Sequence, residues 1–229
     1  MPNAGKNTIT GIIGAKGSGK STEAEKMFLA RDRAIVCDAL GEYRRGFMVS
    51  NKLLFVAHVD KQKKFRIVFL PLELEDFDVC CRTVRAAGNV LFVIEEAGTY
   101  CSPSQIPDAF QKLVRLGRHR NIDITYTAQR FQDINRTLTA QTDVFKLFRV
   151  SEPVDLAALQ KRFGDDLADE VSRQVNYEFR TIVVSEWGIK SNVDSDLDSS
   201  VGSRGMVHRE LAAASRSDGS PPGGTELAG

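Results

Sequence analysis

The chain has 229 residues, of which 42% are hydrophobic and 27% are charged, and its formal net charge is +1. This length suits one domain with an appendage, and the composition is that of an ordinary globular protein. The small net charge excludes a uniformly basic nucleic-acid-binding protein, so any such surface must be a local cluster. No apolar run approaches the roughly 18 residues of a membrane span, and we expect no transmembrane segment.

A strand over 8–15, a glycine-rich loop and a helix over 19–32 are predicted first. The loop GAKGSGKS, residues 14–21, satisfies the phosphate-binding pattern G-x-x-x-x-G-K-[ST]. Glycines let backbone N–H groups surround phosphate oxygens, and the following helix directs its positive dipole end at the same anion. We expect Lys20 to reach the β- and γ-phosphates of ATP and Ser21 to ligate Mg²⁺. The expected cofactor-binding residues are Gly14, Ala15, Lys16, Gly17, Ser18, Gly19, Lys20, Ser21 and Thr22.

A second strand, over 34–39, ends in the acidic turn DALGEY, residues 38–43. Ligands of open α/β sheets bind at the carboxyl ends of strands, which makes Glu42 a candidate to hold a water or another subunit's arginine. The alternative is a plain turn, in which Asp38 accepts backbone hydrogen bonds and Gly41 supplies a positive φ. The sequence leaves both interpretations open.

The next segments predict a hairpin and then a helix. The β-rich runs 53–59 and 65–71 are joined by the basic loop DKQKK, and the basic cluster 61–66 in that hairpin is a candidate to line a pore. A helix is predicted over 73–88, with Gly88 as its stop signal. The four cysteines fit no zinc pattern, and we expect them to be reduced, small apolar residues. They are Cys37, Cys80, Cys81 and Cys101.

A strand over 89–98 ends in two adjacent carboxylates, Glu95 and Glu96. Like charges side by side repel each other unless a metal or a water network compensates, and this cost favours a functional pair. We expect Glu95 to hold Mg²⁺ through water and Glu96 to polarise the water that attacks ATP. A small-molecule kinase must instead keep water away. The alternative is that two polar residues merely terminate a strand.

The remaining pattern predicts an amphipathic helix over 104–120, strands over 122–129 and 144–151, two short helices over 153–175 and an edge strand over 177–186. Alternating strands and helices predict an α/β fold, with a mostly parallel sheet covered by helices on both faces. Composition changes near residue 190. We therefore expect a domain over 1–188 and a Ser/Gly-rich, largely disordered C-terminal tail over 189–229.

The motifs GAKGSGKS, DALGEY, FVIEEAG and GRHRNIDITYTAQR resemble, in this order, those of the HerA/FtsK superfamily of DNA-pumping ATPases. The resemblance covers roughly residues 8–150. Gly-Glu-Tyr after the second strand is similar to the HerA-type branch, and the compact size is similar to the genome-packaging ATPases of tailless, membrane-containing viruses. The first acid of the superfamily is usually Asp, so Glu95 is a departure.

This resemblance implies a RecA/FtsK-like P-loop NTPase core that forms a homo-hexameric ring, with ATP and Mg²⁺ at subunit interfaces. It implies that Gln129 senses the γ-phosphate and couples hydrolysis to movement. An arginine finger that enters a neighbour's site is expected among Arg115, Arg118 and Arg120, and Arg118 is favoured. The alternative for each is that it caps the C-terminus of the preceding helix.

The function expected from the motifs is an ATP-hydrolysing DNA translocase, in particular a viral genome-packaging ATPase that pumps double-stranded DNA into a capsid. Phosphate contacts are expected from the basic clusters 43–45, 61–66 and 115–120. The expected docking partner is a capsid-vertex or membrane protein, and the expected location is the host cytoplasm or the packaging vertex of the virion. The alternatives are a cellular HerA-like translocase, a P-loop phosphotransferase acting on a small metabolite, and a filamentous-phage export ATPase.

Overall fold

One sheet organises the protein, whose computed structural model describes residues 7–187. Within these residues the sheet has eight strands in the order β3-β4-β2-β5-β6-β1-β7-β8. Neighbouring strands pair in parallel, except that the edge strand β8 is antiparallel to β7. The strands are β1 (Ile9–Ile13), β2 (Arg33–Cys37), β3 (Phe47–Val49), β4 (Phe65–Phe69), β5 (Val90–Ile94), β6 (Ile122–Ala128), β7 (Val144–Phe148) and β8 (Phe179–Val183).

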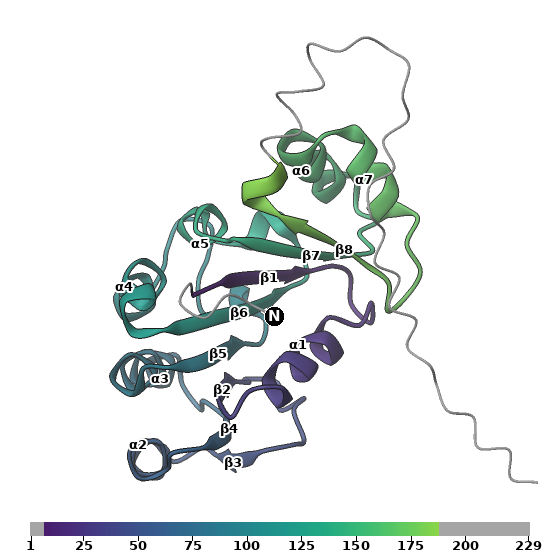
Figure 1. Cartoon of the computed structure of the whole chain (residues 1–229). Helices are drawn as coiled ribbons and strands as arrows, with labels where there is room; N and C mark the ends of the chain where they lie inside the picture. The colour runs from purple at the N-terminus through teal and green to yellow at the C-terminus, as the bar shows by residue number, and fades with distance from the viewer. Residues whose placement is uncertain (1–6, 188–229) are drawn as a thin grey trace, which may run out of the picture.

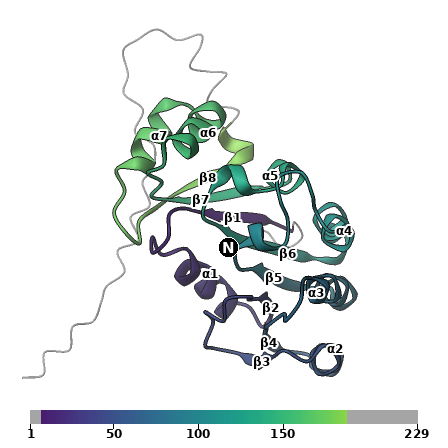
Figure 2. The ribbon, with the colours of Figure 1, turned by 180° about the vertical axis from the view of Figure 1, so that it is seen from behind.

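Helices cover both faces of the sheet, which confirms the predicted α/β architecture (Figures 1 and 2). Helices α2 to α5 lie on one face, α1 lies on the other, and α6 and α7 lie at the β7–β8 end. The α-helices of the described part are α1 (Lys20–Leu29), α2 (Lys52–Lys61), α3 (Leu74–Ala87), α4 (Asp108–Leu116), α5 (Arg136–Ala140), α6 (Pro153–Phe163) and α7 (Asp165–Ser172). The 3-10 turns are η1 (Ala97–Thr99), η2 (Gly117–Arg120) and η3 (Phe131–Asp133).

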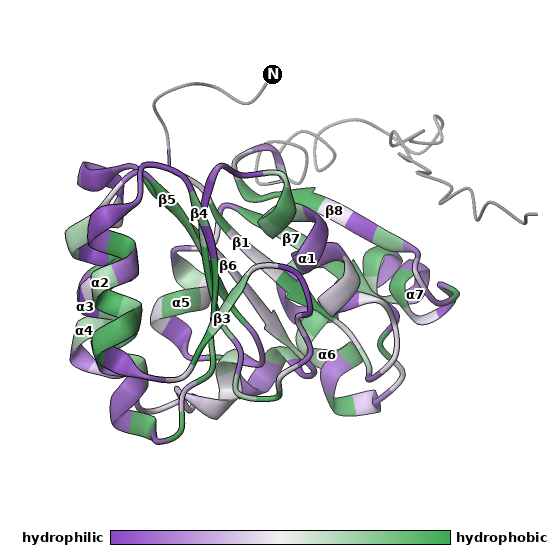
Figure 3. Cartoon of the chain, turned by 90° about the horizontal axis from the view of Figure 1, so that it is seen from below, coloured by the Kyte–Doolittle hydropathy of each residue, from purple (hydrophilic) through white to green (hydrophobic). Residues whose placement is uncertain are grey.

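The central strands are apolar on both sides because both sides are buried. In β2, Ile35 belongs to the core that contains Phe77 of α3, whereas Val36 belongs to the core that contains Phe28 of α1. Figure 3 shows hydrophobic colour along the central strands between α1 and the row of α2, α3 and α4. Such continuous apolar runs are typical of parallel strands with helices on both faces.

The predicted strand over 53–59 is wrong, because these residues form helix α2. The Asn51 side chain accepts hydrogen bonds from the backbone N–H groups of Leu53 and Leu54 at 2.9 and 3.0 Å, which caps the helix. Phe55 and Val59, four residues apart, are the buried residues of its inner face. The basic cluster 61–66 therefore joins a helix to β4, and the predicted hairpin does not exist.

The other predicted strands and helices are present, with ends that differ by a few residues. The short elements β3 and α5 were not predicted. All four cysteines are buried free thiols, as expected, and burial raises the pKa of Cys80 and Cys81.

Among residues 7–187, no helix has the length and apolar character that a bilayer crossing requires. The predicted tail over 189–229 lies outside the described residues.

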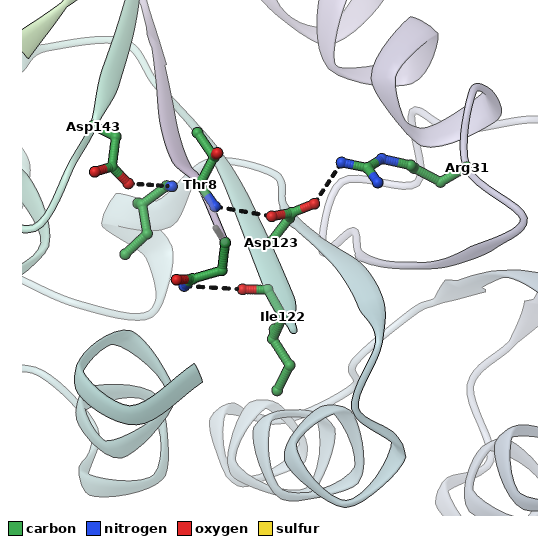
Figure 4. Close-up of polar contacts among 7 residues, drawn as sticks. Thr8, Arg31, Ile122, Asp123 and Asp143 are labelled. Carbon is green, nitrogen blue, oxygen red and sulfur yellow. Dashed lines mark hydrogen bonds and ion pairs between the residues drawn. The ribbon is translucent and has the colours of Figure 1, made fainter. Parts of the chain in front are cut away.

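The amino ends of the strands are tied together by two aspartates (Figure 4). Asp123 of β6 accepts a hydrogen bond from the Thr8 backbone at 2.8 Å and pairs with Arg31, which follows α1. Asp143 accepts a hydrogen bond from the Ile9 backbone at 2.9 Å. These bonds fix β1 between β6 and β7. They therefore also fix where β1 ends relative to its neighbours at the opposite edge of the sheet, where the carboxyl ends of the strands meet.

Candidate nucleotide-binding site

The glycine-rich loop lies between the carboxyl end of β1 and the start of α1, as the sequence predicts. Gly17 and Gly19 have φ values of 74° and 111°, a conformation that favours glycine. A Cβ at Gly14 would lie 2.5 Å from Cβ of Phe148, so the backbone passes too close to β7 for any side chain. In the described chain, no side chain caps the first turn of α1. Its N–H groups and dipole are therefore available to an anion.

Two polar side chains of the loop are buried where phosphate would bind. Lys20 is 5% exposed, and its Nζ donates a hydrogen bond to the Ala15 carbonyl at 3.1 Å. Burial lowers the pKa of Lys20, although the charges of Glu96, Glu95 and Glu42 oppose that shift. The buried Ser18 Oγ has no hydrogen-bond partner among the described residues. A buried ammonium and an unpartnered hydroxyl fit a site that binds phosphate oxygens.

Glu95 is the buried centre of the predicted metal site. Ser21 Oγ donates a hydrogen bond to Glu95 Oε1 at 2.7 Å, so the two predicted Mg²⁺ ligands are adjacent. The Tyr43 hydroxyl donates a hydrogen bond to Glu95 Oε2 at 3.0 Å. Burial raises the pKa of Glu95 to about 7, against the effect of the hydrogen bonds from Ser21, Tyr43 and Thr127. Burial thus favours the protonated form of this carboxyl group, and a cation bound beside it would favour the charged form.

The turn DALGEY serves to place Tyr43. Asp38 Oδ1 accepts hydrogen bonds from the Leu40 and Gly41 backbone at 3.2 and 2.9 Å, and its Oδ2 accepts one from the Tyr43 backbone at 2.9 Å. Gly41 has a φ of 68°. The plain-turn interpretation is therefore correct for Asp38 and Gly41. Sequence reasoning missed the contact of Tyr43 with Glu95, although a tyrosine that follows a strand end near the loop was the available signal.

Glu96 faces away from its neighbour. Its φ of 49° is unusual for a residue other than glycine, and its backbone N–H donates a hydrogen bond to Thr127 Oγ1 at 2.8 Å. Such strain costs about 1–3 kcal/mol and clusters at functional sites. Gln129 Nε2 donates a hydrogen bond to Glu96 Oε1 at 3.1 Å. The structure therefore joins Glu96 to Gln129 and Glu95 to Ser21.

Mg²⁺ fits this arrangement of oxygens. Among residues 7–187, no three His, Cys, Asp or Glu side chains gather into a metal cluster. Mg²⁺ retains several waters and takes one or two protein ligands beside the phosphate oxygens of its substrate. Ser21 Oγ and the Glu95 carboxylate, which are hydrogen-bonded to each other, would be such ligands. Thr22 lies next to them, on a small cavity of about 140 Å³ that is lined by Ser21, Thr22, Glu25, Glu42 and Tyr43.

The arginine-finger candidate Arg118 lies at the opposite edge of the sheet from the phosphate loop of the same chain. Arg118 belongs to η2, immediately before β6, and is therefore at the amino ends of the strands. It is exposed, and its Nε donates a hydrogen bond to His119 Nε2 at 3.4 Å. Arg118 can act on a nucleotide only in another copy of the chain.

A second cavity of about 290 Å³ lies beside the loop. Sequence reasoning missed it, because its walls come from segments that are far apart in the chain. Two of its lining residues are bonded to each other: Arg130 Nε donates a hydrogen bond to the buried Asp155 Oδ2 at 3.1 Å. The cavity is lined by Ala15, Lys16, Gln129, Arg130, Val150, Ser151, Glu152 and Asp155.

Neither the known protein-family models nor the curated protein sequences match this chain. The fold, in contrast, resembles solved structures. The DNA-packaging ATPase B204 of Sulfolobus turreted icosahedral virus aligns over 80% of this chain and 96% of that one, at 21% identity and a TM-score of 0.64. The genome-packaging NTPase B204 of Sulfolobus turreted icosahedral virus 2, solved with ATP-gammaS, aligns over 79% and 94%, at 21% identity and a TM-score of 0.66.

VirB4 of Thermoanaerobacter pseudethanolicus aligns over 77% of this chain and 87% of that one, at 10% identity and a TM-score of 0.61. At such identities the likeness concerns the fold. The chain therefore has the α/β fold of the P-loop NTPases, and in that fold it resembles viral genome-packaging ATPases.

Proposed function

We propose that this protein is an ATPase that moves double-stranded DNA, and that it packages a viral genome into a capsid. The observation that carries the proposal is the separation of the two carboxylates. Glu95 is bound to Ser21 at the phosphate loop, whereas Glu96 is bound to Gln129. This separation supports a metal-binding role for Glu95 and a water-activating role for Glu96, a division that suits hydrolysis better than transfer to a metabolite.

The chemistry follows from what each side chain can hold. Lys20 and the N–H groups at the start of α1 bind the phosphate oxygens, and Tyr43 holds Glu95 in place. Bound Mg²⁺ would neutralise the charge of the β- and γ-phosphates. The Gln129 amide occupies one oxygen of Glu96, so the other oxygen remains free to accept a proton from a water. Gln129 thereby connects the water-activating acid to the end of β6.

The DNA contact is proposed for exposed lysines beside α2. Lys61 and Lys63 are exposed, whereas Lys64 is 2.8 Å from Asp32 in an ion pair. A motor must grip backbone phosphates, because its track has arbitrary sequence. Two exposed lysines can bind only a few DNA phosphates, so the contact requires several copies of the chain arranged in a ring. The similarity in fold to two genome-packaging NTPases supports the packaging role.

We also propose that six copies of the chain form a ring. Arg118 lies at the amino ends of the strands, so a finger role requires a neighbouring subunit to present it. An arginine supplied in this way raises the rate by about 10³–10⁵ in other NTPases. A capsid-vertex or membrane protein would dock the ring, in the host cytoplasm or at the packaging vertex.

Displacement of a triplex-forming strand from duplex DNA tests translocation directly, and light scattering on the same sample measures the ring. We expect displacement that depends on ATP and a mass of about six chains. A monomer whose turnover requires a phosphate acceptor would refute the proposal and favour a phosphotransferase.

A further inference from the structure

Tyr177 places an aromatic ring against the phosphate loop. It lies in the turn between α7 and β8, which runs beside the start of α1 in both views of the ribbon (Figures 1 and 2). The Tyr177 backbone N–H donates a hydrogen bond to the Ser18 carbonyl at 2.7 Å. A Cβ added at Gly19 would lie 2.8 Å from Cδ1 of the Tyr177 ring. The ring therefore rests on the residue that precedes α1.

This ring is not part of the core. Tyr177 is 63% exposed, and its φ of 69° is a conformation that residues other than glycine rarely adopt. Phe148 and Phe179 pack against each other instead, with ring centroids 5.0 Å apart, and Phe148 is buried in the core. The fold thus holds an aromatic residue in a costly conformation and leaves its ring in solvent. Such conformations cluster at active sites and ligand clamps.

The direction in which a nucleotide would lie across the phosphate loop also points to Tyr177. Glu96 follows β5 and Gln129 follows β6, and both strands lie on the same side of β1. In the proposed function these two residues act at the γ-phosphate of ATP. The other neighbour of β1 is β7, and β8 lies beyond it. A triphosphate whose γ end points to the β6 side extends its ribose and base toward the β7–β8 side. Tyr177 lies two residues before β8, and its backbone is bonded to Ser18 of the loop.

We propose that Tyr177 is the stacking wall of the nucleobase site. The inference rests on the proposed function and adds the recognition of the base. Stacking uses the π face, which every base offers, and larger purine rings cover more of the tyrosine. The site would therefore take purine nucleoside triphosphates and would discriminate little between adenine and guanine.

Calorimetric titration with Mg²⁺ and a non-hydrolysable ATP analogue, its GTP counterpart or inorganic tripolyphosphate tests this assignment. We expect Tyr177→Ala to weaken binding of both nucleotides about five-fold or more, on the scale of base–aromatic stacking. Tripolyphosphate, which has no base, should bind the variant and the natural protein equally. Tyr177→Phe keeps the ring and should retain affinity, as should the control Val175→Ala in the same turn.

Unchanged nucleotide affinity in Tyr177→Ala would overturn the assignment, and so would an equal loss for tripolyphosphate, which would indicate a damaged loop. If the natural protein binds neither nucleotide nor tripolyphosphate, both this inference and the proposed function fail. A base-dependent loss in a protein whose ATPase ignores DNA would keep the nucleobase site and refute the translocase alone.

Discussion

Replacing Glu95 by Gln should stabilise the nucleotide-free protein while it removes activity. The pKa of Glu95 is raised from 4.5 to about 7 by burial, so folding favours its protonated form. This contribution to stability is complete below pH 4.5, declines as the pH rises and is lost above pH 7. A difference of about 2.5 pKa units corresponds to about 3 kcal/mol. Glutamine keeps the shape, and its amide suits the hydroxyls of Ser21 and Tyr43 without a charge.

The free energy of unfolding of the natural protein and of Glu95→Gln is measured by urea titration between pH 4.5 and 8.5, with chelator present. The advantage of the variant should grow with pH and level off above pH 7, at about 3 kcal/mol or roughly 6–12 °C in Tm. Glu96→Gln is the matched control, because it makes the same substitution at the adjacent carboxylate, which is only partly buried. A stability difference for Glu95→Gln that stays constant with pH would refute the reasoning.

Three further substitutions test the separate parts of the site. Lys20→Ala should abolish phosphate release with the circular dichroism spectrum unchanged, because the buried ammonium at the loop is lost; unchanged turnover would place the chemistry elsewhere. Glu96→Gln should bind ATP normally in a filter-binding assay and hydrolyse it about 10²–10⁴-fold more slowly, whereas full activity would transfer the base role to Glu95. Gln129→Ala should keep nucleotide affinity and lose the stimulation by DNA, and stimulation that survives would disprove the coupling role.

The sequence predicts where the loop and the two acids lie in the fold, because local rules decide these positions. A glycine pattern requires positive φ at Gly17 and Gly19, and adjacent carboxylates at a strand end must face different surroundings. The structure shows those surroundings: Glu95 points to Ser21, and Glu96 points to Gln129. The mostly parallel pairing of the strands also follows from the alternation of apolar runs and helices.

The parts that sequence reasoning missed depend on tertiary contacts. Residues 53–59 are rich in apolar types, yet Leu53 and Leu54 are exposed, and the cap at Asn51 decides for a helix. Tyr43 reaches Glu95 across 52 positions of the chain. Tyr177 lies more than 150 residues after the loop that it touches. A local sequence pattern cannot reveal contacts between residues so far apart in the chain, and they become visible only in the folded structure.

Phosphate release from ATP, with and without duplex DNA, measures directly whether Glu96 is the base of a DNA-stimulated ATP hydrolysis. Duplex DNA should accelerate release in the natural protein, and release should nearly disappear in Glu96→Gln. Release that is indifferent to DNA, or that occurs only when a metabolite becomes phosphorylated, would contradict this proposal.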